Sequence, residues 1–234
     1  MARDWWKRLP PDERAEYQRS EGMGEVDLAP HPGFVRVIDA LVQALDDENR
    51  EKVQRVSNAL AREIAAGLHM RRAMVRVAAG RPHDQGGELH GLYEPAEAGG
   101  LAHITVWMRT AKRDMVVAPR TFLRTLLHEV VHHIDMERLD LPNSFHSKGF
   151  YRRESSLYRV VTRDTGLARG GRAAAATRPP PPPVRDPAAP PSQAAVDGLA
   201  MLRAVAEEIR TRRGSDVAGP SELSAGDAPG RFKP

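Results

Sequence analysis

Hydrophobic residues recur every three to four positions in several stretches of the chain, which is the spacing of an amphipathic helix. Residues 33–45 and residues 51–68 follow this pattern and predict two helices that contribute to the core. Residues 11–19 predict a shorter helix, preceded by the paired indoles of Trp5 and Trp6. We expect the two indoles to anchor this end of the chain to the core.

The period of the pattern then changes to two, which is typical of strands. Residues 73–78 and 102–109 predict strands, and residues 89–93 predict a weaker one. In the clearest strand, Ile104 and Val106 share one face with Met108. The order of helices, about three strands and further helices predicts an α+β domain with a small antiparallel or mixed sheet.

A further helix is predicted over residues 121–137, with Pro119 just before its first turn, where proline is tolerated. Its apolar positions form a continuous stripe, which indicates a largely buried helix. The stripe consists of Phe122, Leu123, Leu126, Leu127, Val130, Val131 and Ile134.

This helix contains the pattern HExxH, as His128-Glu129-Val130-Val131-His132. A spacing of four residues places both imidazoles on one face of the helix, about one turn apart. Two such rings can bind one tetrahedral zinc ion at ~2.0–2.1 Å. Glu129 is rotated by ~100° from His128, so it can flank the metal without binding it and accept a proton from zinc-bound water.

A catalytic zinc site needs a third protein ligand, and the residues downstream offer two candidates, His146 and Glu154. The metzincin pattern is excluded, because it requires Gly and His where this chain has Asp135 and Arg138. If both candidates lie on one helix, about 12 Å of rise separates them, so they cannot both reach the same ion. The spacing alone leaves the choice open.

The HExxH helix, followed after thirteen residues by a histidine with Phe four positions later, resembles the SprT-like zinc metallopeptidase family. The resemblance covers roughly residues 70–160. It implies a zincin-like fold in which His128, His132 and His146 bind Zn²⁺ and Glu129 is the general base.

The same resemblance implies that Phe150 packs beneath the metal site. The chain departs from the family pattern at Ser147, where the family usually has Gly. It also contains no cysteine for the zinc ribbon that often follows the catalytic core in that family. If His146 binds the metal, we expect Glu154 to accept a hydrogen bond from a ligand imidazole or to pair with a neighbouring arginine.

Several other polar residues near the pattern have simpler interpretations. We expect His133 and Asp135 to support the structure or contact a ligand rather than bind metal. Tyr151 and Tyr158 could donate to a developing oxyanion, although packing in the core or at its rim is the simpler role. A set of basic residues could form a solvated rim or contact phosphate; it consists of Arg109, Lys112, Arg113, Arg120 and Arg124.

Composition excludes several kinds of protein. Without cysteine there are no disulfides, thiolate metal sites or cysteine nucleophiles, so any metal must be bound by His, Asp or Glu. No apolar run approaches the ~20 residues of a membrane span, and we expect a cytoplasmic protein without a secretory signal. The net charge of +4 is only weak support for binding DNA, which usually requires a dense basic stripe.

The composition changes sharply near residue 168, which predicts the end of the metallopeptidase domain, residues 1–168. Residues 169–192 are rich in Pro, Ala and Arg and predict a linker. Residues 193–213 predict an amphipathic helix, and residues 214–234 predict a disordered tail. The linker and this helix are candidates for binding a partner.

The function predicted from these patterns is that of a zinc-dependent endopeptidase acting on a protein or peptide. We expect the substrate to lie extended along the sheet edge, against residues 102–109. The alternatives are a non-catalytic zinc-binding or partner-binding protein and a DNA-associated protein on the same fold. An intact Glu129 argues against the first alternative, because a purely structural zinc site has no use for that carboxylate.

Overall fold

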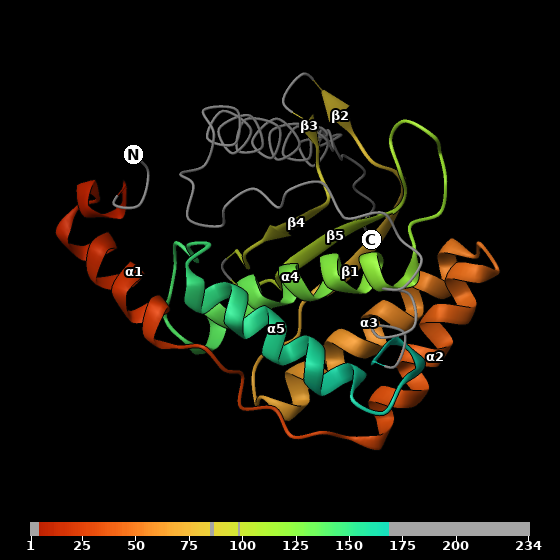
Figure 1. The fold of residues 1–234 in the computed structure, drawn as a ribbon, viewed down its shortest axis with the longest axis horizontal. Helices are drawn as coiled ribbons and strands as arrows, with labels where there is room; N and C mark the ends of the chain where they lie inside the picture. Colours follow the sequence, from red (N-terminus) through yellow and green to blue (C-terminus); the bar gives the residue numbers. More distant parts are fainter. Residues whose placement is uncertain (1–4, 85–86, 98, 169–234) are drawn as a thin grey trace, which may run out of the picture. The chain divides into compact units, whose positions relative to one another are not determined.

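The computed structural model of the 234-residue chain describes residues 5–84, 87–97 and 99–168. The predicted linker, terminal helix and tail at 169–234 lie outside these residues. The described part is a mixed α+β structure of helices packed against a small sheet (Figure 1). Its helices are η1 (Trp5–Arg8), α1 (Pro11–Gly22), α2 (Pro32–Asp46), α3 (Arg50–Gly67), α4 (Pro119–Arg138) and α5 (Lys148–Thr162).

The main sheet has three strands, β1 (Met74–Gly80), β5 (His103–Arg109) and β4 (Gly91–Glu94), in the order β1-β5-β4. β5 runs parallel to β1 and antiparallel to β4, so the sheet is mixed, as the pattern allowed. A separate two-stranded sheet pairs β2 (His83–Asp84) with β3 (Gly87–Glu88). These two-residue strands were not predicted, because they are too short to show a hydrophobic period.

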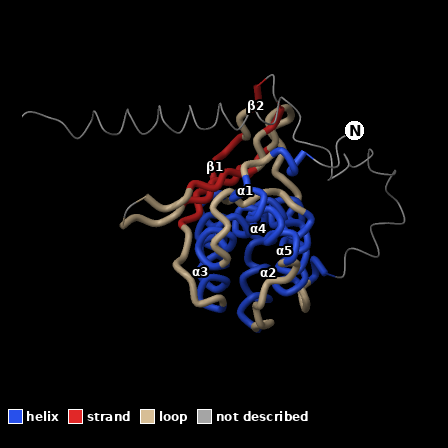
Figure 2. The backbone as a smooth tube through the Cα atoms, turned by 90° about the vertical axis from the view of Figure 1, so that its left-hand side faces the viewer, coloured by secondary structure: helices blue, strands red, loops and turns tan. Residues whose placement is uncertain are grey.

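The helices gather on one side of the main sheet, as Figure 2 shows for α2 to α5. In this layer α3 packs against β1, and α4 packs against β4 and β5. Each helix begins where the sequence offers a suitable residue: the side chain of Asn49 caps α3, and that of Ser147 caps α5. α4 begins at Pro119, whose missing N–H costs nothing at this position.

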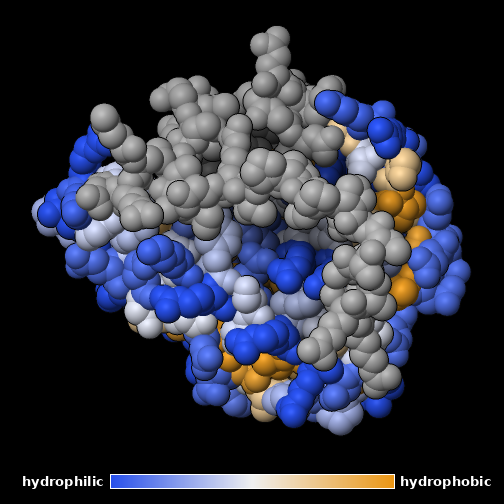
Figure 3. All heavy atoms as spheres, viewed as in Figure 1, coloured by the Kyte–Doolittle hydropathy of each residue, from blue (hydrophilic) through white to orange (hydrophobic). Residues whose placement is uncertain are grey.

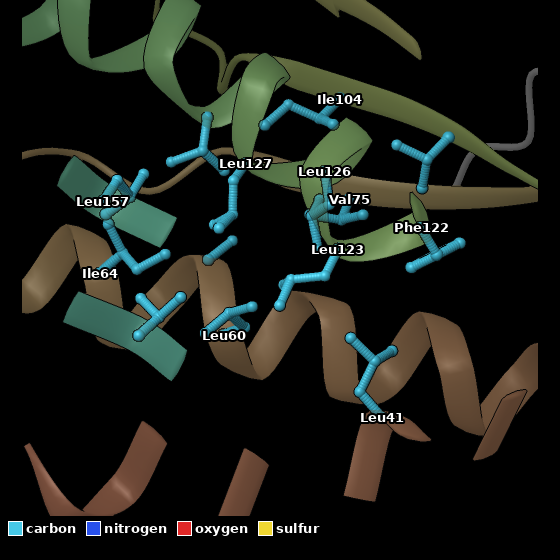
Figure 4. Close-up of a cluster of buried hydrophobic side chains, with 14 of the residues drawn as sticks. Leu41, Leu60, Ile64, Val75, Ile104, Phe122, Leu123, Leu126, Leu127 and Leu157 are labelled. Carbon is cyan, nitrogen blue, oxygen red and sulfur yellow. The ribbon is translucent and has the colours of Figure 1, made fainter. Parts of the chain in front are cut away.

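The hydrophobic core lies between the sheet and the helices (Figure 4). Leu123, Leu126 and Leu127 of α4 lie between strand residues such as Ile104 and the α3 residue Leu60. The whole predicted apolar stripe of α4 is buried. The stripe therefore holds α4 firmly against the sheet and determines the direction in which its polar face points.

One face of the molecule can be seen in Figure 3. The part of the surface that Figure 3 leaves uncovered is mostly hydrophilic, with smaller hydrophobic areas. Among the large hydrophobic side chains of the described residues, Met115 and Tyr151 are the exposed ones. In the same part of the chain, no helix is long and apolar enough to cross a membrane.

The indoles near the start of the chain do anchor it. Trp6 stacks on Tyr17 of α1 with ring centroids 5.4 Å apart, and Trp5 contacts the edge of Tyr17 and of Phe145. The anchor point is thus α1 and the segment before α5, rather than the apolar core itself.

Candidate metal centre

α4 carries the first two histidines of the site. His128 and His132 lie one turn apart on the face opposite the buried stripe, with their ring centroids 5.0 Å apart. Both residues are half-buried, whereas Glu129, between them along the chain, is buried. The apolar packing of α4 thus leaves two imidazoles facing a common point beside a buried carboxyl group.

His146 brings a third imidazole to that point. It lies in the segment between α4 and α5, directly before Ser147. Ser147 is the N-cap of α5, and its hydroxyl accepts a hydrogen bond from Phe150 N. Its Nε2 atom lies 3.1 Å from Nε2 of His128 and 3.1 Å from Nε2 of His132. One nitrogen of each ring lies within 4.8 Å of the other two.

This geometry fits a zinc ion. Four ligands at ~2.0–2.1 Å in a tetrahedron lie about 3.3 Å from one another, close to the spacing of the Nε2 atoms. Three protein nitrogens leave a fourth position open, which is the pattern of catalytic rather than structural zinc sites. Because His146 is exposed, the cluster can be reached from solvent.

Hydrogen bonds at Nδ1 determine which nitrogen carries the proton in His128 and in His132. The Oγ of Ser144 donates its only proton to Oδ2 of Asp135 at 2.9 Å, so it must accept from Nδ1 of His132 at 2.8 Å. Nδ1 of His128 lies 3.3 Å from Oε2 of Glu154, which can only accept when ionised. In both rings the proton is therefore on Nδ1, and the Nε2 lone pair faces the cluster.

The three imidazoles also rest on one aromatic ring. The centroid of Phe150 lies 4.7 to 4.9 Å from the centroids of His128, His132 and His146. Phe150 is fully buried, so it forms an apolar floor under the cluster. This is the place that the family resemblance implied for it.

The surroundings of His132 and His146 favour the neutral form of these two imidazoles. Burial lowers the pKa of His132 well below its usual value, and its neighbours His146 and His128 lower it further. Although the residue as a whole is exposed, the ring of His146 packs against those of His128, His132 and Phe150; this desolvation and the adjacent His128 lower the pKa of His146 to about 4. Neutral imidazoles are the form that binds a metal.

Glu129 is buried and packs closely against β4. Burial raises its pKa to about 7; the charge of His128 opposes this rise and that of Glu154 adds to it. A Cβ atom on Gly91, in the edge strand β4, would overlap Oε1 of Glu129. Glycine at this position therefore lets the strand approach the carboxyl group closely. A carboxyl with a pKa near 7 is suited to accepting and returning a proton.

The other candidate ligand, Glu154, lies beside the cluster but points to its rim. Besides accepting from His128, its carboxylate forms an ion pair with Arg124 at 3.5 Å. The expected contact with a ligand imidazole is therefore present. The pairing partner is Arg124 on α4 rather than one of the adjacent Arg152 and Arg153, because α4 and α5 pack side by side.

The remaining residues singled out from the sequence have supporting roles. Nδ1 of His133 lies 3.1 Å from the hydroxyl of Tyr93, and Nε2 of His133 lies 2.7 Å from the carbonyl oxygen of Arg71. Asp135 forms a fully buried ion pair with Arg153 at 2.8 Å. Neither residue belongs to the histidine cluster, as expected.

The tyrosines and the basic rim differ in their surroundings. Tyr158 is buried under the guanidinium of Arg124, which lies 4.2 Å from its ring centroid, whereas Tyr151 is exposed with its ring 5.8 Å from that of His146. In the basic set, Arg109 pairs with Glu48 and Asp114. Arg124 pairs with Glu154. Two of the five basic residues therefore already have carboxylate partners and are less available to phosphate than the sequence suggested.

One sequence prediction about the site is wrong. Residues 102–109 were expected to offer a free sheet edge, but β5 is the central strand, with β1 on one side and β4 on the other. Beyond β4, Val117 N donates to Met108 O and Val116 bridges to Arg109, so this side of β5 is covered to its end. The sheet edge beside α4 belongs to β4, which the sequence marked only weakly.

Three contributors to the site were missed from the sequence. They are Ser144, Gly91 and Tyr93. The ring of Tyr93 stacks on His132 with centroids 6.3 Å apart. The residues lie outside the HExxH pattern, and their contact with it depends on how β4 and the segment before α5 pack against α4. A serine two residues before a candidate ligand histidine could have been considered as a hydrogen-bond partner.

Comparison with protein-family models, with curated proteins and with solved structures gives no match for this chain. A functional assignment therefore depends on the geometry of the site.

Proposed function

We propose that this protein is a zinc-dependent metallopeptidase that uses His128, His132 and His146 as metal ligands. The observation that carries the proposal is the convergence of three imidazole Nε2 atoms, two of them 3.1 Å from the third, next to a buried glutamate. Imidazole lone pairs that converge on one point are unfavourable unless a metal ion or protons lie between them.

The chain itself supplies most of the required chemistry. A bound zinc ion supplies a Lewis acid and acidifies a water molecule. Glu129, buried beside the cluster, would accept the proton of the attacking water and deliver it to the leaving amine nitrogen. Glu154 and the Ser144–Asp135 pair keep the His128 and His132 rings oriented.

A substrate peptide would then lie along β4 rather than β5. β4 is the strand at the edge of the main sheet beside α4. Its first residue, Gly91, lies directly against the side chain of Glu129. An extended peptide pairing with that edge would have its backbone close to both the carboxyl group and the histidine cluster.

The same observations support the relationship to SprT-like peptidases. The helix with HExxH, the histidine before the next helix and the phenylalanine under the cluster are arranged as that resemblance implies. A zincin-like arrangement of the fold is part of this proposal.

The experiment is a metal analysis of purified protein, comparing the wild type with His132→Ala, His146→Ala and Glu154→Ala. We expect about one zinc per wild-type chain, loss of zinc in His132→Ala, much weaker binding in His146→Ala through the two remaining histidines, and full retention in Glu154→Ala. Zinc retained in His132→Ala would contradict the metal site. Zinc lost in Glu154→Ala and kept in His146→Ala would assign the third ligand to Glu154.

Catalysis is tested separately with Glu129→Gln, which keeps the size of the side chain but cannot accept a proton. This variant should bind zinc as the wild type does and should not cleave an unfolded protein substrate. Equal cleavage by both proteins would exclude the general-base role. A wild type that binds zinc and cleaves no unfolded protein would favour the non-catalytic alternative.

A further inference from the structure

The N-terminal helix α1 contacts the segment that carries His146 on both sides of that histidine. The carboxylate of Glu16 accepts from Asn143 through both its backbone N–H, at 2.8 Å, and its side-chain amide, at 2.6 Å. At the other end of the segment, Glu21 accepts from Lys148 N at 2.7 Å. His146 lies between these two attachment points.

Contacts of α1 also flank His146 directly. The ring of Phe145, the residue before it, lies 6.0 Å from Tyr17 of α1. The hydroxyl of Ser147, the residue after it, is hydrogen-bonded to the hydroxyl of Ser20 at 2.7 Å. A Cβ atom on Gly149 would overlap the carbonyl oxygen of Ser20, so α1 approaches the start of α5 as closely as backbones can.

α1 is unusual in how it attaches. Its buried residues are Glu16 and Ser20, both polar, and both contact the His146 segment. A helix held to its domain by the hydrophobic effect would bury an apolar stripe instead. The hydrogen bonds of α1 therefore fix the position of residues 143–149, whereas α2 and α3 contribute to the hydrophobic core.

We infer that α1, through Glu16 above all, is the positioning element for the third metal ligand. His128 and His132 stand on α4, whose buried stripe holds their backbone in place. His146 lies on a segment without regular secondary structure, and its ring can meet the other two only if that segment stays in place. The inference rests on the proposed function, since it assumes that the three histidines bind a metal.

The test is zinc affinity of the full-length chain, measured by competition with a chromophoric chelator. Outer contacts of metal ligands typically change affinity ~10–100-fold, and we expect a loss of this size in Glu16→Ala. Glu16→Gln retains an oxygen that can accept from Asn143 N, so it should lose less. Asn58→Ala is the matched control. Like Glu16, Asn58 accepts a hydrogen bond from a distant backbone N–H, that of Val75, and its amide also donates to the Val75 carbonyl oxygen.

The decisive comparison adds His146→Ala. If Glu16 acts through His146, Glu16→Ala should weaken zinc binding in the wild type and have no further effect when His146 is already Ala. An equal loss in both backgrounds, or wild-type affinity in Glu16→Ala, would overturn the inference. Should Glu16→Ala fail to fold, Asn143→Ala removes the other side of the same contact and is judged by the same comparison.

These outcomes are separate from those of the proposed function. A wild-type chain that binds no zinc would contradict the metallopeptidase proposal and this inference together. A wild type that binds zinc through His128 and His132, with an affinity that does not depend on Glu16, would contradict the positioning role alone.

Discussion

Ser144 Oγ lies 2.8 Å from Nδ1 of His132 and stands between that imidazole and the buried carboxylate of Asp135. Ser144 reaches both groups from a left-handed backbone conformation, with φ of 40°, which non-glycine residues rarely adopt. Such an outlier persists when its surroundings hold it in place, and here it connects the candidate metal centre to an ion pair in the interior.

The first prediction concerns this serine. Ser144→Ala removes the acceptor of the His132 Nδ1 proton, so the ring is free to rotate or to change tautomer. We expect zinc affinity to fall ~10-fold or more while the protein remains folded. Chelator competition measures the loss, and Ser155→Ala on the exposed face of α5 is the control. Wild-type affinity in Ser144→Ala would show that the contact does not support the ligand.

The second prediction concerns the ion pair behind Ser144. Asp135 and Arg153 are both fully buried, and Arg153 also donates to the carbonyl oxygens of Ser20 and Met23. Arg153→Met would leave the Asp135 carboxylate buried without its partner, which costs about 3–5 kcal/mol. Urea unfolding with chelator present should show this loss of stability.

A double variant checks the cause of that loss. When Asp135→Asn is added to Arg153→Met, no unpaired charge remains, so the double variant should be more stable than Arg153→Met alone. If the two substitutions are simply additive, the loss comes from the broken contacts with Ser20 and Met23 rather than from the stranded carboxylate.

The third prediction is a pH dependence caused by Glu129. Burial raises its pKa from the ordinary 4.5 to about 7 in the folded, metal-free chain. Between these two values the folded state binds more protons than the unfolded state, so stability falls as pH rises through this interval. The cost of ionising this one group in the folded state reaches about 3 kcal/mol above pH 7.

Glu129→Gln removes the titrating group and should remove this part of the pH dependence. With zinc chelated, the variant should therefore be more stable than the wild type at pH 8, and the advantage should shrink toward pH 5. Denaturant unfolding at the two pH values measures this. An advantage that is the same at both would mean that Glu129 is ionised throughout the range.

The sequence was a good guide wherever one periodic pattern governed an element. The apolar stripe of α4 predicted its burial, and the spacing of four residues predicted that His128 and His132 share one face, because both follow from a single helix. The position of His146 could not be predicted from spacing alone. It depends on Ser147 starting α5 and on α1 holding the segment before it, and α1 shows no apolar stripe that would reveal its partner.

The sheet shows the same limit. The alternation in residues 103–109 predicted a strand with one buried face, which is correct, but hydrophobic alternation does not tell a central strand from an edge. Order within the sheet depends on long-range pairing of β5 with β1 and β4. For this reason residues 102–109 were expected at a free sheet edge, whereas β5 is the central strand.

The last prediction tests the edge that the structure offers instead. A Cβ atom on Gly91 would overlap the Glu129 carboxylate, whereas one on Gly80, at the end of β1, would meet no atom within 4 Å. Gly91→Ala should therefore displace Glu129 while leaving the three histidines in place. Because a displacement of ~1 Å can reduce a rate ~10²-fold, we expect hydrolysis to fall by about that factor with zinc content unchanged. Gly80→Ala, which also adds one methyl group to a strand glycine, should keep both activity and zinc. If Gly91→Ala is as active as Gly80→Ala, the close approach of β4 to Glu129 has no part in catalysis.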